Sequence, residues 1–232
     1  MMAEASLILV NTHGRSGFKR FVMGSFAETL LLRSRVPVFV VSSKMRGFRP
    51  IKDLLFPTDF GVHSKSVFKQ AVSIATRMKA SLTIFHSVLN PVEPFFQSGI
   101  YLMGGNWIPI QPYFGNQIES FSRKARAWAK WASHKGVPTE TVMQVEGQGV
   151  AAQIVQAARD RQTSFIVMAA QSGPTAAALI GSVTRQVIRN AECPVWVLRE
   201  DMKVQPEIES ESKSESKEDT AKFDNKYDKH AA

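Results

Sequence analysis

The segment at residues 11–26, NTHGRSGFKRFVMGSF, contains the residue types of a phosphate-binding loop. Its glycines let a backbone approach a ligand closely, and Gly24 and Ser25 precede a run of helix-forming residues. Phosphates bind at a helix start because its first N–H groups have no partner inside the helix. The pattern therefore predicts an anion site here. Ser25 with Glu28 also fits a capping box, which needs no phosphate, and the sequence leaves both interpretations open.

A second candidate site follows the apolar run IKDLLFPTDF at residues 51–60. Pro57, Thr58 and Asp59 come at the end of a predicted strand. In open α/β sheets, ligands bind outside the carboxyl ends of the strands, so a carboxylate at this position is a candidate ligand-binding group. Asp59 is equally suited to cap the helix that follows.

Alternating strands and helices must position these residues. The predicted strands are residues 51–60, 81–88, 140–145, 164–170 and 194–198, and the predicted helices are 63–80, 117–136, 149–162 and one that begins at Gly181. This alternation predicts an open, parallel, five-stranded α/β sheet with helices on both faces, formed by residues 49–200. The aromatic and Pro/Gly-rich segment 89–115 is expected to be a long loop, whose role the sequence does not reveal.

Part of this pattern occurs twice. Residues 24–41 and 181–198 align without a gap at an offset of 157 residues, and a further apolar run precedes each of them, at 6–11 and 164–170. Five aligned pairs are identical: Gly24/Gly181, Ser25/Ser182, Pro37/Pro194, Val38/Val195 and Val40/Val197. The repeat predicts that residues 1–45 form a β-α-β remnant of a second copy.

Composition limits the classes of function. The formal net charge is +9, of which residues 201–232 contribute −3 (six lysines against nine acidic residues), so residues 1–200 carry +12. The Ser/Glu/Lys-rich segment 201–232 has few apolar residues and is predicted to be a disordered charged tail. Cys193 is the only cysteine, no run of 18 apolar residues is present and the first residues do not resemble a secretion signal, so a cytoplasmic protein without a membrane span is expected.

These motifs together resemble the universal stress protein family. The resemblance covers residues about 6–43 and 51–199, with the Pro-Thr-Asp strand end, the Gly-Ser helix start and the Cys-Pro-Val final strand in family order. It implies an adenine nucleotide alpha hydrolase-like, Rossmann-like fold. It also implies a tandem-type protein whose first domain lacks its first three strands, either because they were lost or because the true chain starts upstream of Met1.

The resemblance also implies the positions of a nucleotide site. Nucleotide-binding members carry Gly-x2-Gly-x9-Gly-Ser/Thr after the fourth strand. The first copy has Asn11, Gly14, Gly24 and Ser25 at these positions, whereas the second copy has Ala169, Ser172, Gly181 and Ser182 with one spacer residue fewer, and Gly173 as a substitute glycine. On the adenosine side the matching residues are Pro57, Thr58, Asp59 and Val88.

The expected function is that of a non-catalytic stress-response module that dimerises and senses ATP. The final strands at 37–41 and 194–198 are expected to pair, either within one chain or in a homodimer. No metal site is expected, because no metal-spaced His/Cys cluster is present. Two alternatives remain open: a slow ATPase or phosphotransferase, and a nucleic-acid-binding module, which the absence of a dense basic cluster disfavours.

Overall fold

The structure is a computed structural model that describes part of the chain. The described residues are 7–11, 25–34, 36–42, 44–45, 47, 50–88, 111–144, 149–170 and 180–200. All of them belong to the compact unit Met1–Met202, and a second unit, Lys203–Ala232, lies outside them. The predictions for the tail at 201–232 and for most of the loop at 89–115 therefore fall on residues that the structure does not describe.

Seven strands and five helices are described. The strands are β1 (Ile8–Asn11), β2 (Val38–Val41), β3 (Asp53–Pro57), β4 (Ser81–Ser87), β5 (Thr139–Gln144), β6 (Phe165–Ala169) and β7 (Val195–Leu198). The helices are α1 (Ser25–Arg33), α2 (Val62–Met78), α4 (Gln111–His134), α5 (Val150–Asp160) and α6 (Ser182–Asn190). The predicted β-α-β order of the first copy is confirmed by β1, α1 and β2. The domain boundaries at 45 and 49 stay predictions.

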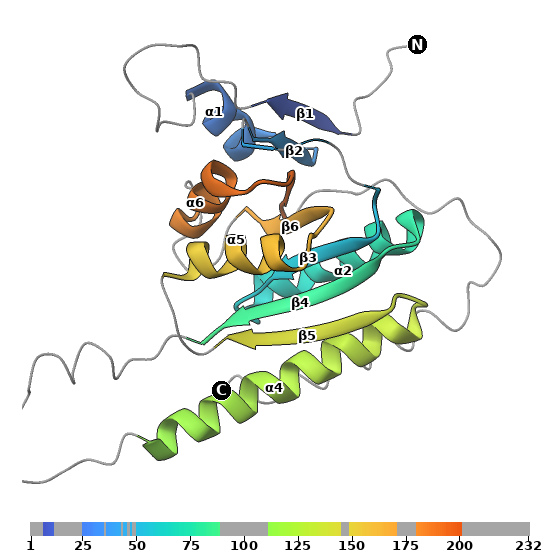
Figure 1. The fold of residues 1–232 in the computed structure, drawn as a ribbon, viewed down its shortest axis with the longest axis vertical. Helices are drawn as coiled ribbons and strands as arrows, with labels where there is room; N and C mark the ends of the chain where they lie inside the picture. Colours follow the sequence, from blue (N-terminus) through green and yellow to red (C-terminus); the bar gives the residue numbers. More distant parts are fainter. Residues whose placement is uncertain are drawn as a thin grey trace, which may run out of the picture. The chain divides into compact units, whose positions relative to one another are not determined.

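The strands form one sheet in the order β1-β2-β7-β6-β3-β4-β5 (Figure 1). The prediction of five strands was therefore wrong in number, because the two strands of the first copy join the sheet of the second copy. All neighbouring strands are parallel except β2 and β7, which pair antiparallel with Val38 opposite Val197. The intrachain form of the predicted pairing between 37–41 and 194–198 is thus confirmed.

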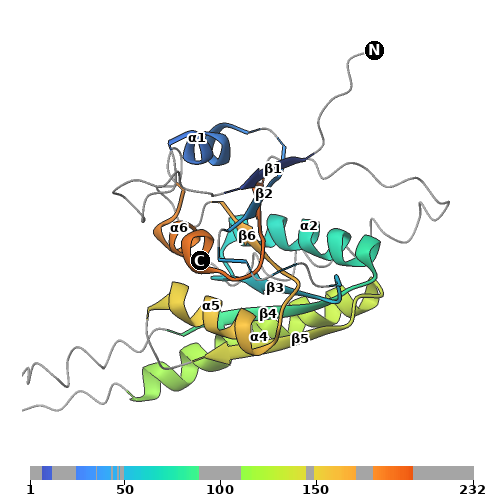
Figure 2. The same cartoon turned by 45° about the horizontal axis from the view of Figure 1, so that its top comes forward.

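Helices cover both faces of the sheet, as predicted (Figures 1 and 2). Helices α2 and α4 share one face, where Phe68 stacks on Trp128 with ring centroids 4.6 Å apart. On the other face, α1, α5 and α6 share a core with the sheet that includes Leu31, Ile154 and Val187. The two layers follow from right-handed crossovers, since the chain adds β4 and β5 on one side of β3 and β6 and β7 on the other.

Helix α4 begins earlier than the sequence predicts. Its backbone is helical from Gln111, six residues before the predicted start, so the predicted loop 89–115 loses its last five residues. Pro112 does not prevent this start, because a first-turn proline removes no intrahelical hydrogen bond. Within the described part of the chain, no helix has both the length and the apolar character needed to cross a bilayer.

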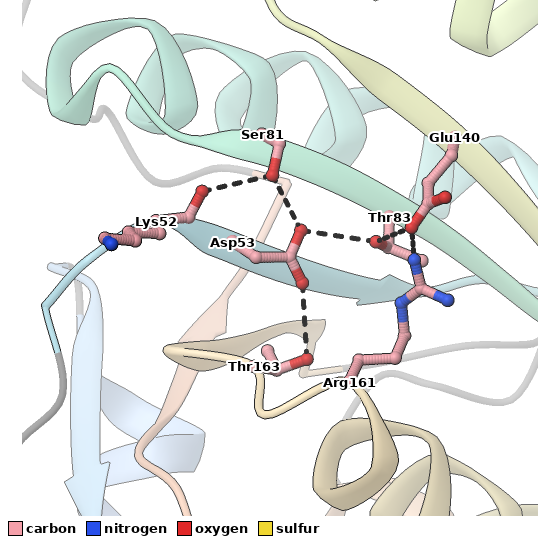
Figure 3. A network of polar contacts seen from close by, with 7 residues as sticks. All are labelled: Lys52, Asp53, Ser81, Thr83, Glu140, Arg161 and Thr163. Carbon is pink, nitrogen blue, oxygen red and sulfur yellow. Dashed lines mark hydrogen bonds and ion pairs between the residues drawn. The ribbon is translucent and has the colours of Figure 1, made fainter.

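A polar network joins the amino ends of four strands (Figure 3). Asp53, the first residue of β3, accepts three hydroxyl hydrogen bonds: from Ser81 Oγ (2.9 Å) and Thr83 Oγ1 (3.3 Å) to Oδ1, and from Thr163 Oγ1 (3.4 Å) to Oδ2. Thr83 Oγ1 also lies 3.2 Å from Glu140 Oε1 in β5, and Glu140 forms an ion pair with Arg161. Thr83 and Thr163 are fully buried, so water does not reach their hydroxyls. Asp53 accepts from Thr163 and shares the Thr83 hydroxyl with Glu140.

Candidate functional site

The sheet has a topological switch point at β3. From β3 the chain continues to β4 on one side, whereas β6, on the other side, is reached only after β5. Residues Leu54 and Leu55 of β3 pair with Phe165 and Ile166 of β6, so the residues that follow both strands lie at the same edge. Ligands of open α/β sheets bind in the crevice outside the carboxyl ends at such a point. Asp59, which follows β3, is therefore at the expected place.

The Asp59 carboxylate is exposed and held in place by its own turn. Its Oδ1 accepts hydrogen bonds from Gly61 N–H at 2.8 Å and from Ser64 Oγ at 2.5 Å. Helix α2 has Gly61 at the N-cap position without a side-chain cap bond, so Asp59 is not the N-cap that the sequence allowed. Both bonds from described residues end on Oδ1, which leaves Oδ2 available to a ligand hydroxyl.

Phe60 fixes the direction of this turn. Its φ is +57°, a left-handed conformation that bulky residues rarely adopt, and its ring is buried. The ring lies 5.1 Å from both the His86 and Trp128 rings, between centroids, while Phe60 N–H donates to Thr58 Oγ1 at 2.9 Å. Aromatic packing thus stabilises a strained residue next to Asp59, an arrangement often found at ligand sites.

At the end of β4, Val88 stays a prediction, and the structure adds its neighbour Ser87 as a second candidate. Val88 is 2% exposed and its N–H donates to Gln144 O at 2.8 Å, so this residue is already used in packing and in the sheet. Ser87 Oγ, one residue earlier, is buried and has no hydrogen-bond partner among the described residues. A buried hydroxyl without a partner calls for an explanation, and a ligand at this strand end would provide one. A hydroxyl residue at the end of an apolar strand is the signal that sequence reasoning missed.

His86 lies beneath the Asp59 turn with a defined tautomer. Its Nδ1 is 2.7 Å from Thr58 O, and since a carbonyl only accepts, Nδ1 carries the proton. In the described part of the chain, no hydrogen-bond partner reaches the buried Nε2 atom. Burial lowers the pKa of His86 from its ordinary 6.5, because the imidazolium loses its hydration; Lys124 adds to this effect, and the Thr58 carbonyl and Asp59 oppose it.

This lowered pKa predicts loss of stability in mild acid. Between the folded pKa and 6.5 the unfolded chain binds more protons than the folded chain, so His86 contributes stability that is present above 6.5 and is lost as pH falls through that window. We expect the free energy of unfolding in urea to decrease as pH falls from about 8 to 5. His86→Asn should flatten this dependence of stability on pH. Equal slopes for wild type and His86→Asn would contradict the prediction.

The phosphate side of the site is the start of α6. Gly181 is the N-cap residue without a side-chain cap bond, Ser182 is exposed, and no acidic residue occupies the first turn. The helix is held against β6, because Gly181 N–H donates to Ala170 O and Thr184 Oγ1 donates to Ala169 O, both at 3.3 Å. The first N–H groups of α6 are therefore presented at the carboxyl edge of β6, where an anion is favoured.

The other predicted residues are distributed as follows. Ala169 is the last residue of β6, and Ser172 and Gly173 lie outside the described residues. In the first copy, Asn11 ends β1 and Ser25 begins α1, whereas Gly14, Gly24 and the side chains of Ser25 and Glu28 are not described. Three strands separate β1 from β3, so the sheet brings Asp59 to the phosphate side of the second copy and not to that of the first.

Chemically, the site combines one anchored carboxylate, one buried hydroxyl and an uncapped helix start. Carboxylates accept hydrogen bonds from sugar hydroxyls, and helix starts bind phosphates, so together they match a nucleoside phosphate. Among the described residues, no group of three His, Cys, Asp or Glu side chains could hold a metal ion.

Comparisons with known proteins show the family of this chain. A family model described as the universal stress protein family matches residues 3–42 and 50–199. Universal stress protein MJ0531 of Methanocaldococcus jannaschii is 31% identical over 169 residues, which cover 71% of this chain and 92% of that protein.

Solved structures show the same fold. A universal stress protein from Archaeoglobus fulgidus is similar with a TM-score of 0.57 and 19% identity, over 84% of this chain and 60% of that chain. The functionally unknown protein PA1789 from Pseudomonas aeruginosa is similar with a TM-score of 0.53 and 18% identity, over 84% of this chain and 64% of that chain. This chain thus spans less than two thirds of the length of either protein.

Proposed function

Because this chain belongs to the universal stress protein family, we propose that it is a stress-response module that binds an adenine nucleotide and responds to it without turning it over. One observation carries the proposal. The exposed Asp59 carboxylate is anchored at the switch point of the sheet, where the uncapped start of α6 follows the neighbouring strand β6. Either group alone is common, but both at one edge match the two ends of a nucleoside phosphate.

Each part of the site has a role in this proposal. Asp59 Oδ2 accepts a ribose hydroxyl, and the end of β4 lies along the base. The N–H groups at the start of α6 bind the phosphates. Ala169 places a Cβ where the family pattern has a glycine, so the backbone there approaches the ligand less closely than a glycine would allow. The site is therefore expected to bind nucleotide more weakly than a site with both glycines.

Sensing follows from where the ligand is held. Asp59 precedes α2, which covers one face of the sheet, and Gly181 precedes α6, which covers the other (Figure 2). A nucleotide that contacts both helix starts links the two helix layers. It stabilises the arrangement of α2 and α6 in which both helix starts can contact the nucleotide at once. Nucleotide binding would then shift the population of helix arrangements, and a partner protein could recognise the arrangement of the nucleotide-bound state.

Asp59→Asn tests the sugar contact. Asparagine keeps an Oδ1 acceptor for Gly61 and Ser64 but loses the charge, so the turn should persist while ATP affinity falls by about tenfold. Isothermal titration calorimetry with ATP measures the change. Asp160→Asn is the matched control, because Asp160 is an exposed aspartate in α5 whose hydrogen bond is to Gln156 of the same helix. Unchanged affinity in Asp59→Asn would remove Asp59 from the site.

Gly181→Val tests the phosphate contact. Gly181 has φ −53°, which any residue can adopt, so the Gly181→Val variant should fold. The valine side chain should then act only through its bulk at the start of α6. We expect the ATP-dependent rise in melting temperature to be lost. Gly149→Val is the matched control: Gly149 is the N-cap residue of α5, has φ −49° and has open space around an added Cβ. Loss of the shift in both variants would show that helix starts in general, and not this site, are affected.

Two further features are part of the proposal. The slow-ATPase alternative requires phosphate release that Asp59→Asn abolishes, whereas sensing requires binding without release, so a phosphate assay on the ATP complex separates them. We propose a cytoplasmic protein, in keeping with its single cysteine. A homodimer through the final strands would have to separate β2 from β7, because these strands already pair within one chain.

A further inference from the structure

The repeat in the sequence is also a repeat in the structure. Helices α1 and α6, and strands β2 and β7, correspond residue for residue at an offset of 157. Strands β1 and β6 correspond at an offset of 158, because Ile8 N–H donates to Pro37 O at 2.9 Å where Ile166 N–H donates to Pro194 O at 3.0 Å. The two copies can therefore be compared position by position.

The comparison shows a strand that lacks one neighbour. In the described sheet, β6 lies between β7 and β3, whereas β1 pairs only with β2 and forms the edge (Figure 1). Leu9 of β1 is 69% exposed, and its counterpart Val167 of β6 is fully buried. Leu7 is 41% exposed, and its counterpart Phe165 is 2% exposed. The same strand type is thus buried in one copy and exposed in the other, and the difference is the cover that β3 and α2 give to β6.

The exposed residues continue a surface that is already an interface. Leu9 is paired with Phe39 in β2, and Phe39 is paired with Trp196 in β7, with 5.6 Å between their ring centroids. This row crosses the junction between the two copies and ends at the open edge. The backbone is also open there: Ile8 N–H points to β2, and hydrogen-bond directions alternate along a parallel strand, so Leu9 N–H points outward.

We propose that the outer edge of β1 docks a β-strand from a partner protein, parallel to β1, with apolar side chains on both faces. The template is β3, which pairs parallel with β6 and whose Leu54, Leu55 and Phe56 are fully buried. A strand added to an exposed edge gains backbone hydrogen bonds and buries apolar side chains. A second copy of this chain fits less well, because a two-fold axis at β1 would pair the strands antiparallel, unlike the template.

A fluorescent peptide with the sequence of residues 50–59, PIKDLLFPTD, is the probe, titrated with the full chain and followed by anisotropy. We expect saturable binding, weakened by about tenfold or more in Leu9→Lys, because the lysine places a charge in the new contact. Val62→Lys is the matched control: Val62 is 72% exposed on α2, so the same kind of change is made away from β1. The same peptide with proline in place of its second leucine should not bind, since it cannot complete the ladder.

Three results would overturn the proposal. The first is no saturable binding of the peptide to a chain whose melting curve shows that it is folded. The second is equal weakening by Leu9→Lys and Val62→Lys, which would mean non-specific apolar contact. The third is a concentration-dependent dimer of the wild-type chain, detected by light scattering, that Leu9→Lys dissociates. That result would assign the edge to a second copy of the chain.

Discussion

Asp53→Ala is expected to lower the free energy of unfolding by about 2 to 4 kcal/mol. The substitution removes the acceptor of three hydroxyl hydrogen bonds from Ser81, Thr83 and Thr163. Thr83 and Thr163 are fully buried, so water does not reach their hydroxyls. Thr83 keeps Glu140 Oε1 at 3.2 Å as a second acceptor, whereas Thr163 loses the carboxylate that it contacts. Urea unfolding followed by circular dichroism measures the change.

Two controls test this prediction for the network in Figure 3, one at Asp53 itself and one outside the network. Asp53→Asn should lose less stability than Asp53→Ala, because the amide keeps one oxygen acceptor and the threonine hydroxyls can rotate toward it. Asp160→Ala removes an exposed aspartate outside the network and should change stability by only about 0.5 kcal/mol. If Asp53→Ala unfolded at the same urea concentration as Asp160→Ala, the carboxylate would not hold the strands together.

Phe60→Ala is expected to cost about 3 kcal/mol or more of stability and to weaken nucleotide binding as well. The ring fills the space between His86, Trp128 and Phe121, and its loss leaves a cavity under the turn. Asp59 depends on that turn for its orientation, so the variant should lose ATP affinity even though no ligand contact has been removed. Thermal unfolding and calorimetry on the same sample report both effects.

A comparison of two variants at this position tests the backbone strain separately. In the middle of a helix or strand, glycine usually makes a protein less stable than alanine does, by about 0.5 to 1 kcal/mol in the free energy of unfolding. At φ +57° the order should reverse, because alanine keeps the strain of a left-handed residue and glycine does not. We therefore expect Phe60→Gly to be at least as stable as Phe60→Ala. If Phe60→Gly were less stable than Phe60→Ala, the backbone at Phe60 would not be strained.

The candidate site could be predicted only in part. The Pro-Thr-Asp segment at the end of β3 and the Gly-Ser start of α6 were identified from local pattern, because strand ends and helix starts are encoded by neighbouring residues. Val88 stays a prediction, and Ser87 became a second candidate only in the structure, because the hydrogen bond of Val88 N–H and the burial of Ser87 Oγ depend on residues distant in the chain. The role of Asp53 was also missed, because its partners are 28, 30 and 110 residues away.

The sequence by itself determined the elements, the repeat and the family, because apolar periodicity, turn residues and short motifs act over a few neighbouring positions. The resemblance had predicted that 37–41 and 194–198 pair, but only the tertiary structure decided that they do so within one chain, antiparallel. It also decided that the sheet has seven strands instead of five and that β1 is left at the edge with Leu9 exposed. These outcomes depend on which strand lies beside which. Strand pairing joins residues that are distant in the chain, and no local pattern specifies it.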